Sequence, residues 1–120
     1  MEYTIKDSGA RQEFATGARR DERKGKGRYD LIPHEPLRRL AIQYELGAEK
    51  YGDDNWQKGM PMSRMFDSAL RHLWNWRMRQ FEGIPCDEDE LAAVLFNVMA
   101  MMHYELYNPE LNDMGVSSQD

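Results

Sequence analysis

The sequence lacks the features that define several large classes of protein. Its 120 residues include one cysteine, Cys86, so no disulfide forms within the chain. No stretch approaches the roughly 18 uninterrupted apolar residues of a membrane helix. Residues 1–14 contain no apolar segment of the secretory-leader type. These absences predict a soluble, cytoplasmic protein that has no membrane partner.

Motifs for zinc binding and for phosphate-binding loops are absent as well. No His-x-x-x-His pair and no Cys–His cluster occurs, which argues against a structural zinc site. Neither a P-loop nor a Gly-x-Gly-x-x-Gly motif is present, and Gly25-Lys26-Gly27 is too short to indicate either. The 3 Trp, 6 Tyr and 4 Phe argue against a disordered chain and favour one folded domain.

Charge is distributed unevenly along the chain. Residues 1–40 hold ten Lys/Arg against seven Asp/Glu, whereas residues 41–120 hold six against fourteen. An acidic body argues against a general DNA-binding protein, so no specific nucleic-acid partner is expected. A basic arm beside an acidic body better suits a small phosphate-bearing molecule and a cation. The basic excess centres on Arg19, Arg20, Arg23, Lys24, Lys26 and Arg28.

Hydrophobic periodicity predicts three amphipathic helices, and no segment shows a convincing strand pattern. The helices are expected over about 36–51, from Pro61 or Ser63 to about Phe81, and from Asp87 or Asp89 to about Tyr107. Their expected ends are Gly52, Gly83-Ile84-Pro85 and Asn108-Pro109.

The predicted fold is all-α: a bundle of three main helices with an N-terminal arm. Residues 1–33 form the arm, residues 34–108 the helical catalytic domain, and residues 109–120 a frayed C-terminal tail. Three helices bury limited area in one chain, and their apolar stripes are wide and rich in methionine. We therefore expect a homo-oligomer, a dimer or a tetramer, in which neighbouring chains complete the core.

Glu45 and Glu49 lie four residues apart on the first predicted helix, so their carboxylates project from one face. These like charges repel, and neither Ala41 nor Asp53, one turn to either side, is basic. A divalent cation resolves the repulsion, because Mg²⁺ takes carboxylate oxygens together with waters and substrate phosphates. The alternative is a solvated helix edge bridged by Lys or Arg from a neighbour.

Four acids, residues 87–90, lead into the apolar stripe of the third predicted helix. Asp87-x-x-Glu90 has the form of a capping box, and acids stabilise the positive end of a helix dipole. Capping by Asp87 is compatible with a Glu90 side chain that faces inward, toward Glu45 and Glu49. The run therefore has a structural role and also a candidate metal ligand.

Two further residues are candidates for substrate contact. His72 stands beside Arg71 on the second predicted helix, where it is either a core histidine or a substrate ligand. Trp56 follows Asn55 in a polar loop. An aromatic ring there can stack on a base while the amide hydrogen-bonds to the base edge. The alternative is that Trp56 packs onto the helices.

Several strings occur together and in a fixed order. They are Phe14-Ala15-Thr16-Gly17-Ala18, Gly25-Lys26-Gly27-Arg28-Tyr29-Asp30-Leu31-Ile32-Pro33, Gly47-Ala48-Glu49-Lys50-Tyr51-Gly52-Asp53-Asp54-Asn55-Trp56, Asp67-Ser68-Ala69-Leu70-Arg71-His72-Leu73 and Glu88-Asp89-Glu90-Leu91-Ala92-Ala93, followed by Asn97. With these strings the chain resembles the phage-type dATP/dGTP diphosphohydrolase N-terminal domain family, a relative of the MazG-like all-α nucleotide pyrophosphohydrolases. The similarity covers about residues 14–107.

The resemblance implies hydrolysis of a (deoxy)nucleoside triphosphate, a purine such as dGTP or dATP, to the monophosphate and pyrophosphate. It implies Mg²⁺ or Mn²⁺ as cofactor and, for a phage-encoded chain, the host cytoplasm as location. MazG-like enzymes hold their metals with Glu-Glu-x-x-Glu on one helix and Glu-x-x-Asp on a later one. Glu45, Glu49 and Glu90 match three of these acids, whereas Leu46 and Ala93 occupy two of the other positions.

By this resemblance Glu45, Glu49 and Glu90 are the expected catalytic metal ligands, with Asp89 as a further ligand. Side chains expected to compensate for the missing acids are Asp53, Asp67, His72, Asp89 and Asn97. Lys24, Lys26 and Arg28 are expected to close over the triphosphate. The other expected nucleotide-binding residues are Lys50, Asn55, Trp56, Arg71, His72 and Asn97.

Two other functions fit the same residues. One is a non-catalytic helical module that contacts nucleic acid or a partner protein through its basic arm, the acids serving solubility. The other is a metal phosphohydrolase built around His72, although the sequence has no adjacent His-Asp pair.

Overall fold

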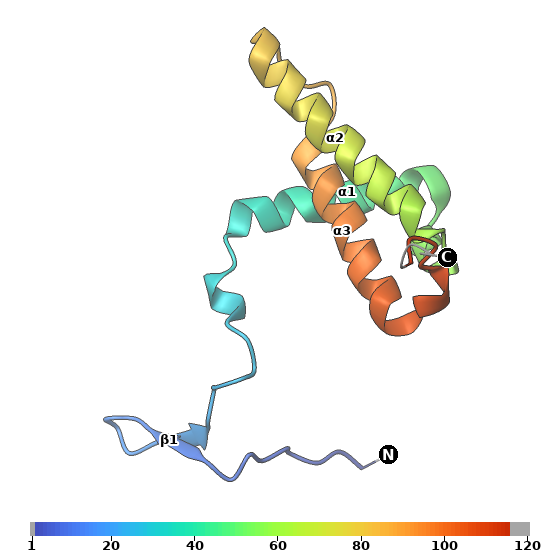
Figure 1. Cartoon of the computed structure of the whole chain (residues 1–120). Coiled ribbons are helices and arrows are strands. Elements are labelled where there is room, and N and C mark those ends of the chain that lie inside the picture. The colour runs from blue at the N-terminus through green and yellow to red at the C-terminus, as the bar shows by residue number, and fades with distance from the viewer. Residues whose placement is uncertain (1, 116–120) are drawn as a thin grey trace. The chain divides into compact units, whose positions relative to one another are not determined.

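The computed structural model of the chain describes residues 2–115 and divides after Ile32 into two compact units (Figure 1). The N-terminal unit contains a two-stranded antiparallel hairpin, β1 (Arg11–Glu13) with β2 (Arg19–Asp21), and a 3₁₀ turn, η1 (Tyr29–Leu31). The expectation of an entirely helical chain is therefore wrong for this segment. Strands of three residues are too short to show the alternation from which strands are predicted.

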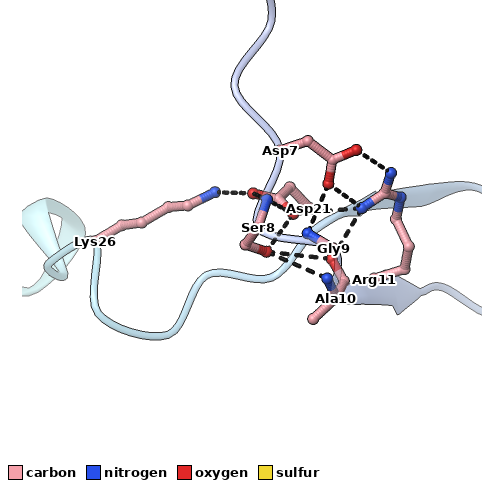
Figure 2. Close-up of polar contacts among 7 residues, drawn as sticks. All are labelled: Asp7, Ser8, Gly9, Ala10, Arg11, Asp21 and Lys26. Carbon is pink, nitrogen blue, oxygen red and sulfur yellow. Dashed lines mark hydrogen bonds and ion pairs between the residues drawn. The ribbon is translucent and has the colours of Figure 1, made fainter.

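Asp21, at the end of β2, organises the hairpin (Figure 2). Its carboxylate accepts from the Ser8 hydroxyl at 2.5 Å and from Lys26 Nζ at 2.8 Å. Lys26, followed by Ser8, lowers the pKa of Asp21. Arg11 donates twice to Asp7, both at 2.6 Å, and this hydrogen bonding lowers the pKa of Asp7 to about 2. The charges of Lys26 and Arg11 are therefore already paired inside the hairpin.

Three helices form the second unit, and the three predicted helices are confirmed. They are α1 (His34–Tyr51), α2 (Met62–Glu82) and α3 (Glu90–Tyr107). A 3₁₀ turn follows α1, η2 (Asn55–Lys58), and another follows α3, η3 (Pro109–Leu111). Among the described residues, no helix has the length and apolar character needed to cross a membrane.

The helix ends follow the predicted chemistry, with one correction. Gly52 and Gly83 end α1 and α2 at φ of 92° and 72°, a region that glycine adopts without steric cost. At the start of α3 the N-cap is Asp89, whose carboxylate accepts from the Ala92 N–H at 3.2 Å. Of the two residues predicted to start this helix, Asp89 is therefore confirmed as its cap, and the capping box formed by Asp87 is wrong.

Helices α2 and α3 run antiparallel and pack on each other, and the last turns of α2 extend beyond the start of α3 (Figure 1). Small side chains line the contact, with Ala69 of α2 against the alanine-rich side of α3, and they let the two backbones approach closely. Among residues 2–115, Tyr104 is the one large side chain that is fully buried, and its hydroxyl donates to the Trp56 carbonyl. Met62 and Met65 complete this small core.

The segment after α3 is ordered against the helices, so the expectation that the chain frays from Glu110 onward is wrong for the described part. Leu111 of η3 packs on the Met–Tyr104 core. Asp113 accepts from the Ser63 hydroxyl at 2.5 Å and from the Ser63 backbone N–H at 2.9 Å, at the start of α2. Residues 116–120 lie outside the described residues.

An ion pair joins α1 to the start of α3. Arg39 donates from Nε and Nη2 to the two carboxylate oxygens of Asp89, at 2.8 and 2.6 Å. The hydrogen bonds from Arg39, helped by the Ala92 N–H, lower the pKa of Asp89. One carboxylate therefore both caps α3 and fastens it to α1.

Asp89→Asn tests this link, because asparagine still caps a helix but cannot pair with Arg39. A carboxyl whose pKa is lowered by folding stabilises the protein above its unfolded-state pKa, 3.8, and loses that contribution as the pH falls through the folded-state pKa. Urea unfolding at pH 7 should show a loss of roughly 0.5–1 kcal/mol, and the difference should shrink as the pH falls below 3.8 and through the lowered folded-state pKa of Asp89. Asp87→Asn, at an exposed position, is the control; a difference that persists in acid contradicts the assignment.

Candidate functional site

Glu90, the first residue of α3, carries a buried carboxylate, with 3% of the residue exposed. His72 Nδ1 lies 2.6 Å from one oxygen, and Asn75 Nδ2 donates to the other at 2.9 Å. Both partners come from α2, where a three-residue step places them on one face. The positive end of the α3 dipole also favours an acid here. Both oxygens are thus satisfied and the carboxylate is held in one position.

Glu88 adds a third ligand to this pair. The ligand atoms of His72, Glu88 and Glu90 lie within 4.8 Å of one another, and no other such group of three His, Cys, Asp or Glu occurs in residues 2–115. Carboxylates suit Mg²⁺ and Mn²⁺, and an imidazole nitrogen favours a transition metal over Mg²⁺. Glu88 is exposed, so water reaches the group from its side. This donor set fits a divalent cation.

Asp89 lies between these glutamates in sequence but has other partners. Its oxygens accept from Arg39 and from the Ala92 N–H, and it is not in the group around Glu90. In this arrangement Asp89 positions α3, which holds Glu88 and Glu90 in place. Its role as a metal ligand stays a prediction.

A cleft of about 730 Å³ lies along the second half of α1. This volume is in the range of small-molecule sites. Four aromatic residues line it, Tyr51 among them, and the other three contact one another edge to face. Tyr44 and Phe96 have ring centroids 4.9 Å apart, and the Trp56 ring lies 6.3 and 6.4 Å from them. Asn55 of η2 adds a half-buried amide. Trp56 therefore packs on the helices and also faces the cleft, which combines the two expectations for it.

Every charged side chain that lines the cleft is acidic: Glu45, Asp53 and Asp54. A bare polyphosphate would be repelled by these carboxylates, so a phosphate ligand needs a cation to accompany it. Burial raises the pKa of Tyr44, which keeps its hydroxyl protonated and able to donate. The cleft suits a flat, apolar group more than a free anion.

The two glutamates predicted on the first helix have different surroundings. Glu45 lines the cleft, whereas Glu49 is exposed and does not. Neither belongs to the group around Glu90, so within the described residues the structure does not gather Glu45, Glu49 and Glu90 into one ligand set. The inward orientation expected for Glu90 is present, but it faces α2.

The other predicted binding residues are spread over the molecule. Lys50 is exposed and its ammonium lies 5.1 Å from the centre of the Tyr51 ring. Arg71 is exposed on α2. Asn97 is buried, and its amide donates to the Ala93 carbonyl of its own helix at 2.8 Å.

The basic residues of the N-terminal unit also differ in their surroundings. Lys26 is paired with Asp21, and Arg28 donates twice to Asp30, at 2.8 and 2.9 Å. Lys24 is exposed. Their predicted closure over phosphates stays a prediction.

Asn75 and Glu88 were not among the predicted site residues, although both belong to the surroundings of Glu90. Asn75 follows His72 by three residues, so helical spacing alone puts them on one face. Its partner could not be found that way, because Glu90 reaches it through tertiary packing across 15 residues of sequence. Glu88 was visible only as one of four consecutive acids.

Removing His72 leaves one oxygen of the buried Glu90 without its partner. We expect His72→Ala to lower the unfolding free energy by roughly 1–3 kcal/mol, the cost of an unsatisfied buried acceptor. Chemical unfolding in EDTA measures this without a metal contribution. Arg71→Ala, at the exposed neighbouring position, should change stability by less than about 0.5 kcal/mol. Equal stabilities of the two variants would contradict the burial argument.

Comparison with known proteins gives one match. A family model described as dATP/dGTP diphosphohydrolase, N-terminal, matches residues 16–114. The match includes α1, α2 and α3, and hence His72, Glu88 and Glu90. No curated protein and no solved structure matches the chain.

Proposed function

The chain belongs to the dATP/dGTP diphosphohydrolase N-terminal domain family, and on that premise we propose that it hydrolyses a purine deoxynucleoside triphosphate to the monophosphate and pyrophosphate with Mg²⁺ or Mn²⁺. One observation carries the proposal. A nearly inaccessible carboxylate, Glu90, is fixed by His72 and Asn75 within ligand distance of Glu88. A carboxylate that is buried and fixed in this way favours a cation-binding role over the alternative that these acids only keep the surface soluble.

His72, Glu88 and Glu90 would hold the cation. A divalent ion supplies positive charge to phosphate oxygens and makes a bound water a better nucleophile at neutral pH. Asn75 holds one oxygen of Glu90 and so keeps the carboxylate oriented. The other oxygen lies 2.6 Å from His72 Nδ1, so a bound cation would take the place of this contact or use the second ring nitrogen of His72.

The cleft is proposed to take the nucleoside. Trp56, Tyr44 and Phe96 offer apolar faces to a purine, and Asn55 offers both a donor and an acceptor for its edge. Glu90 and Phe96 are six residues apart on α3, about 9 Å along the axis. The same helix therefore carries one residue of the candidate metal group and one residue of the cleft.

The remaining predicted residues keep defined roles in this proposal. Glu45 lines the cleft, where its carboxylate can accept from water or contribute to a second cation. Glu49 and Asp89 remain proposed ligands, as do Lys24, Lys26 and Arg28 for the phosphates. A homo-oligomer remains the proposed active form.

Metal binding gives the first test. Titration of Mn²⁺, followed by the loss of its free EPR signal, should show binding that Glu90→Gln and Glu88→Gln each weaken at least about tenfold. Incubation with dGTP or dATP and Mn²⁺ should release pyrophosphate and monophosphate, and both variants should lose at least about a hundredfold in rate. Glu105→Gln, an exposed acid on the same helix, should leave both measurements unchanged.

The same assay separates the competing interpretations. If Glu49→Ala abolishes turnover while the helical content is unchanged, the ligand set extends to α1. If no triphosphate is hydrolysed and residues 19–28 instead confer salt-sensitive DNA binding, the non-catalytic module is correct.

Asn55→Ala tests the cleft. Loss of a base-edge hydrogen bond should raise KM for dGTP by about five- to tenfold, because such a bond contributes on the order of 1 kcal/mol, with little change in kcat. Gln57→Ala removes an amide from the same turn that does not line the cleft and should leave KM as in the wild type. A fall in kcat at constant KM would place Asn55 outside nucleoside binding.

A further inference from the structure

The cleft along the second half of α1 combines aromatic rings with acids, and no basic side chain is found among its described lining residues. Its acids are Glu45, Asp53 and Asp54, and within residues 2–115 none of them forms an ion pair. Asp54 accepts from the Gln57 amide at 3.2 Å, but this donor is neutral and leaves the negative charge in place. A ligand in the cleft therefore meets three carboxylates that no described ion pair neutralises.

The aromatic rings of the cleft add a second attraction for positive charge. The face of such a ring is negative because of its π-electrons, and a cation within about 6 Å of the ring centroid is attracted to it. One lining ring already has a partner of this kind, since Lys50 Nζ lies 5.1 Å from the centre of the Tyr51 ring. Among the described residues, no Lys or Arg lies over the rings of Tyr44, Trp56 and Phe96. These three rings are therefore available to a cationic ligand.

Rings and carboxylates are also close neighbours along the chain. Glu45 follows Tyr44 on α1, and Asp54 precedes Trp56 by two residues at the turn after that helix. All four of these residues line the same cleft. The attraction of the ring faces and that of the carboxylates therefore act on the same bound group.

These surroundings discriminate between purines by their charge. A neutral purine gains contact with the rings, and its amino groups can donate to the carboxylates. A purine with a positive charge on its ring gains the same contacts and is also attracted to the carboxylates and to the ring faces. The charge on the base is thus the property that this cleft reads most strongly.

We propose that the cleft selects cationic purines, the class that forms when a ring nitrogen such as N7 is alkylated. This preference rests on the proposed function, in which the cleft takes the nucleoside, and it makes alkylated purine nucleoside triphosphates the preferred substrates. The reaction is otherwise that of the proposed function. Alkylation at N7 leaves the opposite edge of the base free for the Asn55 amide. Hydrolysis of such nucleotides would remove damaged bases from the triphosphates that a polymerase can use.

The cleft fits this occupant better than a bare metal ion or a small alkylammonium ion. Its volume of about 730 Å³ is in the range of sites for whole small molecules. Aromatic rings offer no ligand atom to a hard metal ion, which takes oxygen ligands. A flat cation uses the rings and the carboxylates together, whereas a metal ion uses only the carboxylates.

Binding of two monophosphates in EDTA tests the preference without metal and without turnover. Guanosine and 7-methylguanosine 5′-monophosphates differ by one methyl group and one positive charge. At about pH 6 the methylated base is a cation and the carboxylates are ionised. Calorimetric titration of the full chain should show at least about tenfold tighter binding of the methylated nucleotide. A methyl group by itself accounts for only about fourfold.

Removing the charge of the cleft should remove the preference. The triple variant Glu45→Gln, Asp53→Asn, Asp54→Asn changes only exposed positions. Asn also tolerates the positive φ of 56° at residue 54. In this variant the ratio of the two dissociation constants should fall to about fourfold or less. Helical content by circular dichroism checks the fold.

A matched control removes the same number of negative charges elsewhere. Glu35→Gln, Glu82→Gln and Glu105→Gln change one exposed acid on each helix, none of which lines the cleft. This triple variant should keep the wild-type ratio. If its ratio falls as far as that of the cleft variant, net charge is responsible and the proposal is overturned.

The remaining outcomes separate this preference from the proposed function. Equal binding of the two nucleotides by a chain that hydrolyses dGTP overturns the preference and leaves the hydrolysis standing. A charge-dependent preference in a chain that hydrolyses no triphosphate supports the cleft assignment and removes the activity. Binding of neither nucleotide overturns the cleft as a nucleoside site, and the preference with it.

Discussion

The candidate site depends on one constraint: a carboxylate inside a small helical unit must have partners for both oxygens. Glu90 satisfies it with His72 and Asn75, two residues of α2 that share a face. These bonds define how the start of α3 is placed along the middle of α2. They also bring Glu88 within reach of the same point. The same contacts that pack α2 on α3 therefore also bring together the candidate ligand group of His72, Glu88 and Glu90.

A second attachment, from Arg39 to Asp89, places α1 relative to this pair. Farther along the same two helices, Tyr44 meets Phe96 and the aromatic cleft begins. α3 therefore contributes first to the ligand group and then to the cleft. In the proposed function the acidic lining of the cleft requires a cation, because a triphosphate would be repelled by these carboxylates without one.

The features that depend on local chemistry were predicted correctly from the sequence. Helix positions followed from periodicity, and Gly52 and Gly83 ended α1 and α2 as predicted. Two features were not predicted from the sequence. The hairpin pairs strands of only three residues, which are too short to show an alternating pattern. The C-terminal segment is held by a hydrogen bond from Ser63 to Asp113, 50 residues away in sequence. The same distance limit explains why Asn75 was not joined to Glu90, 15 residues away in sequence, whereas two acids on one predicted helix drew attention to Glu45 and Glu49.

The sequence by itself determined three amphipathic helices, an acidic body, a basic N-terminal segment and membership of the family, because these depend on residue type, spacing and matched strings. Only the tertiary structure decided which acid becomes buried. Glu88, Asp89 and Glu90 are consecutive and chemically alike, yet one is exposed, one caps and anchors the helix, and one is enclosed by α2. The difference arises because Glu88 and Asp89 precede the first helical residue, Glu90, and because α2 packs against the side of α3 from which the Glu90 carboxylate projects.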